Sequence, residues 1–128
     1  MKPSKQNGRR YILHGHIPVP CKNPLVWARW MEGNTANRIV RQEYVGPYWV
    51  STVFLGLSLP DHPAGLFQTM IFRDATDDDH REWTRRGWDS NCPEHLQLEN
   101  TPVYDASTWR LALKHHAAAV GWVRDWFS

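Results

Sequence analysis

The chain has 128 residues, which is the usual size of one folded domain, and its 41% hydrophobic and 22% charged residues exclude a wholly disordered chain. The formal net charge of +2 is too small to give the whole surface a basic field, so composition alone does not indicate a polyanion partner. No apolar run approaches the roughly 20 residues of a membrane span, which excludes a membrane protein of that kind.

The chain begins with a basic stretch. Lys2, Lys5, Arg9 and Arg10 occur there without any acidic residue, and no apolar period is present. We therefore expect a flexible basic arm over residues 1–10 and a single α+β domain over residues 11–128.

A short strand and a helix are predicted next. Residues 11–13 read as a strand, and the prolines at 18 and 20 indicate an edge or extended segment after it. Asn23 followed by Pro24 predicts a helix start, and Gly33 predicts its end. Three apolar residues at spacings of three and four predict that this helix lies on a sheet: Trp27, Trp30 and Met31.

Three strands are expected in the middle of the chain. Residues 38–45 and 48–57 flank Gly46-Pro47 and form a hairpin signal. Both faces of the second run are mostly apolar, so it is predicted to be the central strand. Turn-forming residues separate it from a further strand over residues 66–72.

The segment from 74 to 92 carries a short helix with consistent end signals. Thr76 is a capping residue, aspartates fill the first turn and Gly87 can terminate the helix. Trp83 is its only large apolar residue, so we expect a surface helix held by Trp83 and Trp88.

The remaining residues predict one more strand, over 95–99, and the longest helix, opened by Ser107. The apolar face of that helix is expected to pack on the sheet through Trp109, Leu113, Val120, Val123 and Phe127. The predicted fold is α+β in the order β-α-β-β-β-α-β-α, with two helices on one face of a mostly antiparallel sheet and a short surface helix.

Several motifs occur in a recognisable order. They are Pro18-Val19-Pro20, Trp27-Ala28-Arg29-Trp30, the strand segments 51–57 and 66–72, and Ser107-Thr108-Trp109. Over residues 11–116 this order resembles a family of small uncharacterised proteins encoded by tailed phages and prophages. The resemblance implies an origin on a mobile element and no particular activity. This chain departs from the family pattern at Gln68, where the family is usually acidic, and in the helix after Phe72, where the family is usually short and Gly-rich.

Cysteine use indicates a reducing compartment. Cys21 and Cys92 are the two cysteines, and the first residues lack the apolar stretch of a secretion signal. We expect a cytoplasmic protein of the host bacterial cell, without a disulfide.

Two enzymatic readings are weaker alternatives. His14 and His16 could join Cys92 and His95 in a tetrahedral zinc site, although partly exposed strand and loop residues are the simpler explanation of all four. Cys21 could be a thiol nucleophile with His16 as its base, but no orienting acid or oxyanion-hole motif accompanies them.

No other catalytic signal stands out. His115 and His116 are successive helix residues, so one is expected to face the core and the other solvent. The scattered glycines form no phosphate-binding motif. We predict no catalytic residue, metal or cofactor, and keep a small zinc-dependent or nucleotide-handling enzyme as an alternative.

A nucleic-acid-binding module is a further alternative. Cations alternate with indoles in the surface helix, and the N-terminal arm adds four more cations. The aspartates one helical turn away would repel the same phosphates. The residues of this reading are Lys2, Lys5, Arg9 and Arg10.

The favoured hypothesis is non-catalytic binding to a protein. Eight tryptophans exceed what a small core needs, and a capped helix rich in Trp and Arg is typical of an interaction hot spot. The predicted contact residues are Arg81, Trp83, Arg85, Arg86 and Trp88. The partner would be a copy of this chain, a host-defence component or a phage assembly component.

Overall fold

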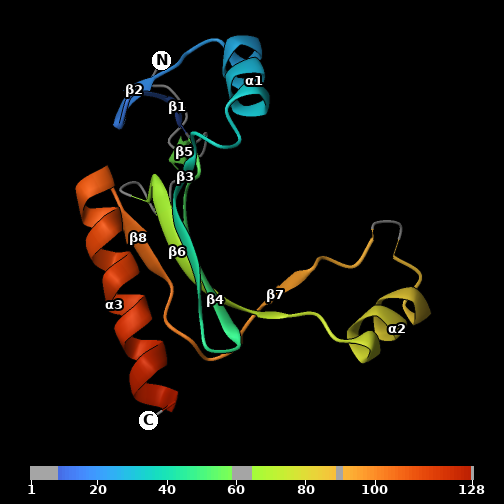
Figure 1. Ribbon diagram of the computed structural model, residues 1–128. Coiled ribbons are helices and arrows are strands. Elements are labelled where there is room, and N and C mark those ends of the chain that lie inside the picture. Colours follow the sequence, from blue (N-terminus) through green and yellow to red (C-terminus); the bar gives the residue numbers. More distant parts are fainter. Residues whose placement is uncertain (1–8, 59–64, 89–90, 128) are drawn as a thin grey trace.

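The computed structural model describes residues 9–58, 65–88 and 91–127, and it confirms the α+β class. The elements, in chain order (Figure 1), are β1 (Arg9–His14), β2 (Ile17–Pro20), α1 (Pro24–Gly33), β3 (Ile39–Val45), β4 (Tyr48–Phe54), β5 (Leu57–Ser58), β6 (Phe67–Asp74), α2 (Asp77–Arg85), β7 (His95–Gln97), β8 (Tyr104–Ala106) and α3 (Trp109–Phe127). The strands form two antiparallel sheets where one was expected: β2-β1-β5, and a larger sheet in which β3-β4-β6-β7 are neighbours and β8 also pairs with β6.

The core lies between the large sheet and α3. Strand β4 is central, as predicted, because it pairs with β3 on one side and β6 on the other. Alternate residues of β4 and β6 point toward α3 and are fully buried. These core residues are Val50, Thr52, Phe54, Phe67, Thr69 and Ile71.

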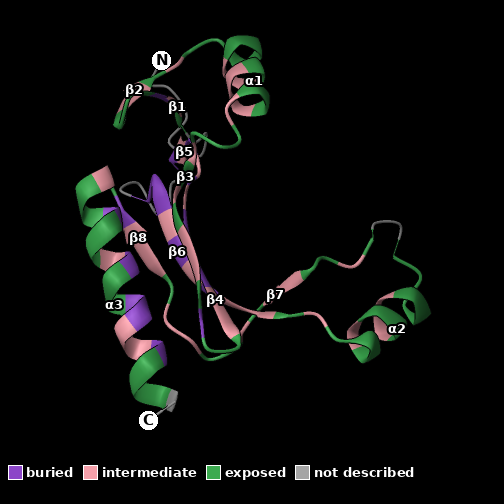
Figure 2. Ribbon diagram, viewed as in Figure 1, coloured by how far each residue is buried: buried purple, intermediate pink, exposed green. Residues whose placement is uncertain are grey.

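Helix α3 corrects two sequence predictions. Its capping side chain is Thr108, whose Oγ1 accepts from the Leu111 amide at 3.1 Å, and not Ser107. Leu113 was expected in the core but is 40% exposed. The buried stripe instead contains smaller or polar residues that let the helix approach the sheet (Figure 2): Ala112, His116, Ala119, Val120 and Val123. The side chain of Phe127 lies outside the described part of the structure.

A buried polar chain connects α3 to the sheet. Thr52 Oγ1 lies 2.7 Å from Thr69 Oγ1 and 2.8 Å from His116 Nδ1. His116 Nε2 lies 2.8 Å from the Glu43 carboxylate, which also accepts from Arg41. His116 is therefore the core-facing member of its pair, and its polar atoms are satisfied.

Helix α1 packs on the small sheet and not beside α3 (Figure 1). Asn23 Oδ1 accepts from the amides of Leu25 and Val26 at 2.9 and 3.3 Å, which confirms the predicted helix start. The indole of Trp27 donates to the carbonyl oxygens of Tyr11 and Gly56 at 3.1 and 2.9 Å, so the predicted apolar face does meet a sheet.

Strands β1 and β2 form a hairpin with a two-residue turn. Arg9 and Arg10 belong to β1, where they pair with Ser58 and Leu57, so they are not part of a flexible arm. Pro18 and Pro20 do not prevent pairing, because they occupy alternate positions and turn their missing N–H groups to the free edge. Among the described residues, no helix is long and apolar enough to cross a membrane.

Candidate functional site

The predicted surface helix forms the middle of a projecting segment, residues 75–94, which we call the arm. Figure 1 shows that α2 lies beyond the end of the large sheet, on the side away from α3. No residue of α2 is buried, and Trp88 after it is 48% exposed. None of the described residues of the arm thus belongs to the buried core.

Local signals explain why the arm folds. Thr76 and Asp79 form a reciprocal capping box: Thr76 Oγ1 accepts from the Asp79 amide, and the Asp79 carboxylate accepts from the Thr76 amide. Gly87 has φ 70° and donates its amide to the Thr84 carbonyl at 3.0 Å, which ends the helix. Both end predictions are confirmed.

Charge pairing ties the arm to β6. Arg73 donates twice to the Asp79 carboxylate, at 2.6 and 3.0 Å. This pairing, together with the Thr76 amide, holds the pKa of Asp79 well below its usual range. The backbone adds a bond from the Ala75 amide to the Glu94 carbonyl at 2.8 Å.

A polar and aromatic cluster braces the root of the arm on the sheet face opposite α3. Asp74 Oδ1 accepts from Tyr44 Oη at 2.8 Å and lies 3.1 Å from His95 Nδ1. The His95 ring stacks on Trp49 with centroids 4.0 Å apart. Asp74 raises the pKa of the Tyr44 hydroxyl. Sequence reasoning missed this cluster, although alternation along the hairpin places Tyr44 opposite Trp49.

The two predicted indoles meet at the far end of the arm. Trp83 and Trp88 contact edge to face, with ring centroids 4.3 Å apart. The Arg86 guanidinium lies 5.2 Å from the Trp88 ring centroid. Trp83 is half-buried by these neighbours, whereas Trp88 presents a large apolar surface to solvent.

The cations of α2 are paired with carboxylates of the same helix. Arg85 Nε and Arg86 Nε each donate to Glu82 at 2.9 Å, and these two bonds lower the pKa of Glu82 to about 2. Arg81 is paired with Asp78. A phosphate would have to compete with these partners, so the arm has little of the free positive charge that nucleic acids require.

The second basic group lies elsewhere. Arg9 and Arg10 are on β1, at the opposite end of the molecule from α2 (Figure 1), and Arg10 lies over the Trp27 ring at 5.9 Å. Lys2 and Lys5 lie outside the described residues. The structure therefore does not bring the two predicted basic groups into one surface.

The structure does not bring together the residues of the two enzymatic alternatives. His14 and His16 lie at the β1–β2 turn and not on one strand, far from Cys92 and His95 on the arm side (Figure 1). Within the described ranges, no three His, Cys, Asp or Glu side chains are grouped as a metal site would need. Cys21 is separated from His16 by the whole of β2, and its thiol contacts the Asn23 carbonyl instead.

Comparisons with protein families, with curated proteins and with solved structures found no match to this chain.

Proposed function

We propose that this chain acts by non-catalytic binding to another protein, which the arm contacts through Trp83 and Trp88. The observation that carries the proposal is an indole pair at the end of a braced helix that buries none of its own residues. Following the phage and prophage resemblance, the proposed setting is the cytoplasm of a bacterial host. The proposed partner is a host-defence component or a phage assembly component.

The chemistry of the arm suits a protein partner. Binding energy at protein interfaces is concentrated in a few Trp, Tyr and Arg residues surrounded by a polar rim. Trp88 offers the exposed apolar surface, and Arg81, Arg85 and Arg86 form the rim with their carboxylate partners. The cap and the Arg73–Asp79 pair hold the helix in place before contact, which reduces the entropy lost on binding.

Charge makes a nucleic-acid partner the weaker alternative. Residues 77–86 contain Asp77, Asp78, Asp79 and Glu82 against three arginines, so the arm is not cationic. Salt-dependent binding to a polyanion requires net neutralisation of phosphates, which this balance does not supply.

The proposal is tested by affinity capture with the full chain as bait. The bait variants are wild type, the double variant Trp83→Ala/Trp88→Ala and Trp126→Ala, applied to extracts of phage-infected bacterial cells. Trp126 is a matched control, because it is an exposed indole (54%) on α3, away from the arm. We expect a protein that wild type and Trp126→Ala retain equally and that the double variant binds about 30-fold more weakly.

Two results would contradict the proposal. One is equal retention of every captured protein by the double variant. The other is an equal loss of binding in Trp126→Ala, since this would indicate nonspecific hydrophobic binding by any exposed indole. Mass measurement of the pure chain by size exclusion reveals whether the partner is a second copy.

A further inference from the structure

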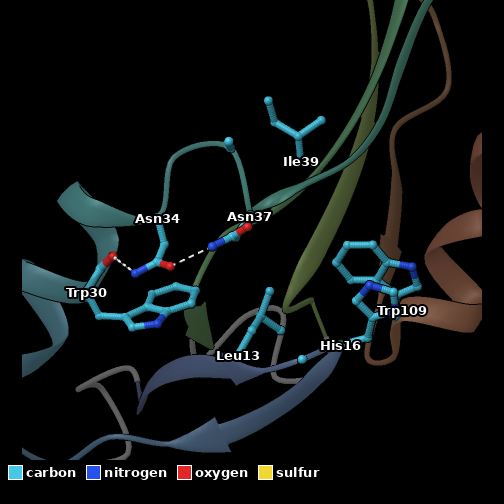
Figure 3. A pocket seen from close by; sticks show the side chains of 9 residues that line it. Leu13, His16, Trp30, Asn34, Asn37, Ile39 and Trp109 are labelled. Atoms are coloured by element: carbon cyan, nitrogen blue, oxygen red, sulfur yellow. Dashed lines mark hydrogen bonds between the residues drawn. The ribbon is translucent and has the colours of Figure 1, made fainter.

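A pocket of about 440 Å³ lies at the other end of the molecule from the arm, where three segments meet (Figure 3). The β1–β2 hairpin supplies Leu13 and His16, the helix α1 and the loop after it supply Trp30, Asn34 and Asn37, and α3 supplies Trp109. Pockets of this size hold small organic ligands in other proteins.

Aromatic side chains form the walls of the pocket. Trp30 and Trp109 are fixed from below by edge-on contacts with Phe54 and Phe67, with centroids 6.0 Å apart in each pair. In Figure 3 the buried Leu13 lies between the two indoles, at the base of the pocket. A flat ring suits such walls, because stacking uses a π-face and needs little depth.

The structure already places one flat nitrogen heterocycle here. The imidazole of His16 lies parallel to the Trp109 indole, with centroids 3.7 Å apart and an interplanar angle of 2°. His16 is exposed and is carried by the hairpin turn. The Trp109 side of the pocket is therefore a stacking wall.

The rim offers an oriented carboxamide. Asn34 Nδ2 donates to the Trp30 carbonyl at 2.8 Å, and Asn37 Nδ2 donates to Asn34 Oδ1 at 2.8 Å. Asn37 is exposed, and the bond to Asn34 is the side-chain hydrogen bond that it makes within the described part of the chain, so its Oδ1 and second N–H face solvent. A carboxamide with a free acceptor and a free donor complements the adenine edge, where N6 donates and N7 accepts.

The residues that line the pocket include no Asp, Glu, Lys or Arg, so the lining favours a ligand without a formal charge. We propose that this pocket binds an adenine-type purine base, stacked between Trp30 and the His16–Trp109 pair and held at its edge by Asn37. The base could belong to a free nucleoside or to a single-stranded nucleic acid, since both present the same ring.

The test is a titration of the full chain with adenosine, followed by the NMR signals of the Trp30 and Trp109 indole N–H groups. We expect both signals to move, with a dissociation constant of about 1 mM or lower. Uridine, which lacks the N6–N7 edge, should bind at least about fivefold more weakly. Asn37→Ala should weaken adenosine by a similar factor, and Asn91→Ala, an exposed asparagine on the arm, should not.

The proposal would be overturned if neither indole signal moved with adenosine. Equal binding of uridine and adenosine would overturn it too. The uridine comparison uses the wild type and stays decisive even where Asn37→Ala disturbs the loop. Tighter binding of an oligodeoxyadenylate than of adenosine assigns the base to a single strand; equal binding assigns it to a nucleoside. The arm variant Trp83→Ala/Trp88→Ala should bind adenosine normally, so this proposal and the proposed function fail independently.

Discussion

Glu43 is a partly exposed residue of β3 that contacts the buried His116 of α3. Its carboxylate accepts from His116 Nε2 and lies beside Arg41, and the bond from His116 is the main cause that lowers the pKa of Glu43 below 4.5. The folded state thus binds a proton on Glu43 less readily than the unfolded chain does. Its stabilising contribution is complete above the ordinary glutamate value and disappears as pH falls through the lowered one.

Acid unfolding of Glu43→Gln tests this linkage. The wild type should lose free energy of unfolding below about pH 4.5, and the variant should lose less over the same range because it has no carboxylate to protonate. Denaturant unfolding at several pH values measures both slopes. Asp79 and Glu82 titrate with the same sign in both proteins, so the difference between the slopes reports Glu43. Parallel curves would show that the His116 bond does not select the ionised form.

Gly56 and Gly87 have nearly the same positive φ angle in different surroundings. Their φ angles are +71° and +70°, but a Cβ on Gly56 would lie 2.8 Å from Met31 Sδ and 3.2 Å from the Tyr11 carbonyl, whereas one on Gly87 would meet nothing within 4 Å. Gly87→Ala should destabilise the arm alone, by a backbone strain of about 1–2 kcal/mol. Gly56→Ala should lower the global free energy of unfolding by more than that. Equal losses would show that Met31 moves aside freely.

Sequence reasoning at this scale identified residue types better than their neighbours. The pattern predicted that one of His115 and His116 faces the core, but hydrophobicity favoured Leu113 for the stripe that Ala112 and His116 occupy. The reason is that close packing selects small side chains, and the partners of His116 on β3 and β4 lie 73 and 64 positions away in the chain.

At the scale of elements, helices with local end signals were the most predictable parts. Asn23 and Thr76 act as caps because each side chain reaches an amide within three residues, so the information is contiguous. Strands β5 and β8 were missed, since they have two and three residues and exist only through pairing with distant strands. The contacts of Asp74 with Tyr44 and His95 were missed for the same reason.

The capping box should control the arm without controlling the fold. Thr76→Ala removes one acceptor of the box and should cost α2 about 1 kcal/mol, seen as faster amide exchange in residues 77–86 with little change in global unfolding. Thr84→Ala is the control, because Thr84 is an exposed residue in the last turn of α2, away from the cap, and its hydroxyl donates to the His80 carbonyl. Unchanged exchange in Thr76→Ala would mean that the Arg73–Asp79 pair alone holds the helix.

At the scale of the whole molecule, the class was predictable and the arrangement was not. The two-sheet division and the projection of the arm from the end of β6 depend on strand pairings between distant segments, which no local pattern contains (Figure 1). The surface character of α2 was predictable, because a helix with one large apolar residue cannot bury a stripe. The partners of its charged side chains were not predictable from the sequence.

The proposed function requires that the indoles of the arm form a contact surface and are not part of the core. Denaturant unfolding of Trp83→Ala/Trp88→Ala tests this directly, with Phe67→Ala as the core reference. We predict that the double variant loses at most about 1 kcal/mol of unfolding free energy, whereas Phe67→Ala loses about 3–5 kcal/mol. A loss in the double variant as large as that of Phe67→Ala would show that the two indoles belong to the core.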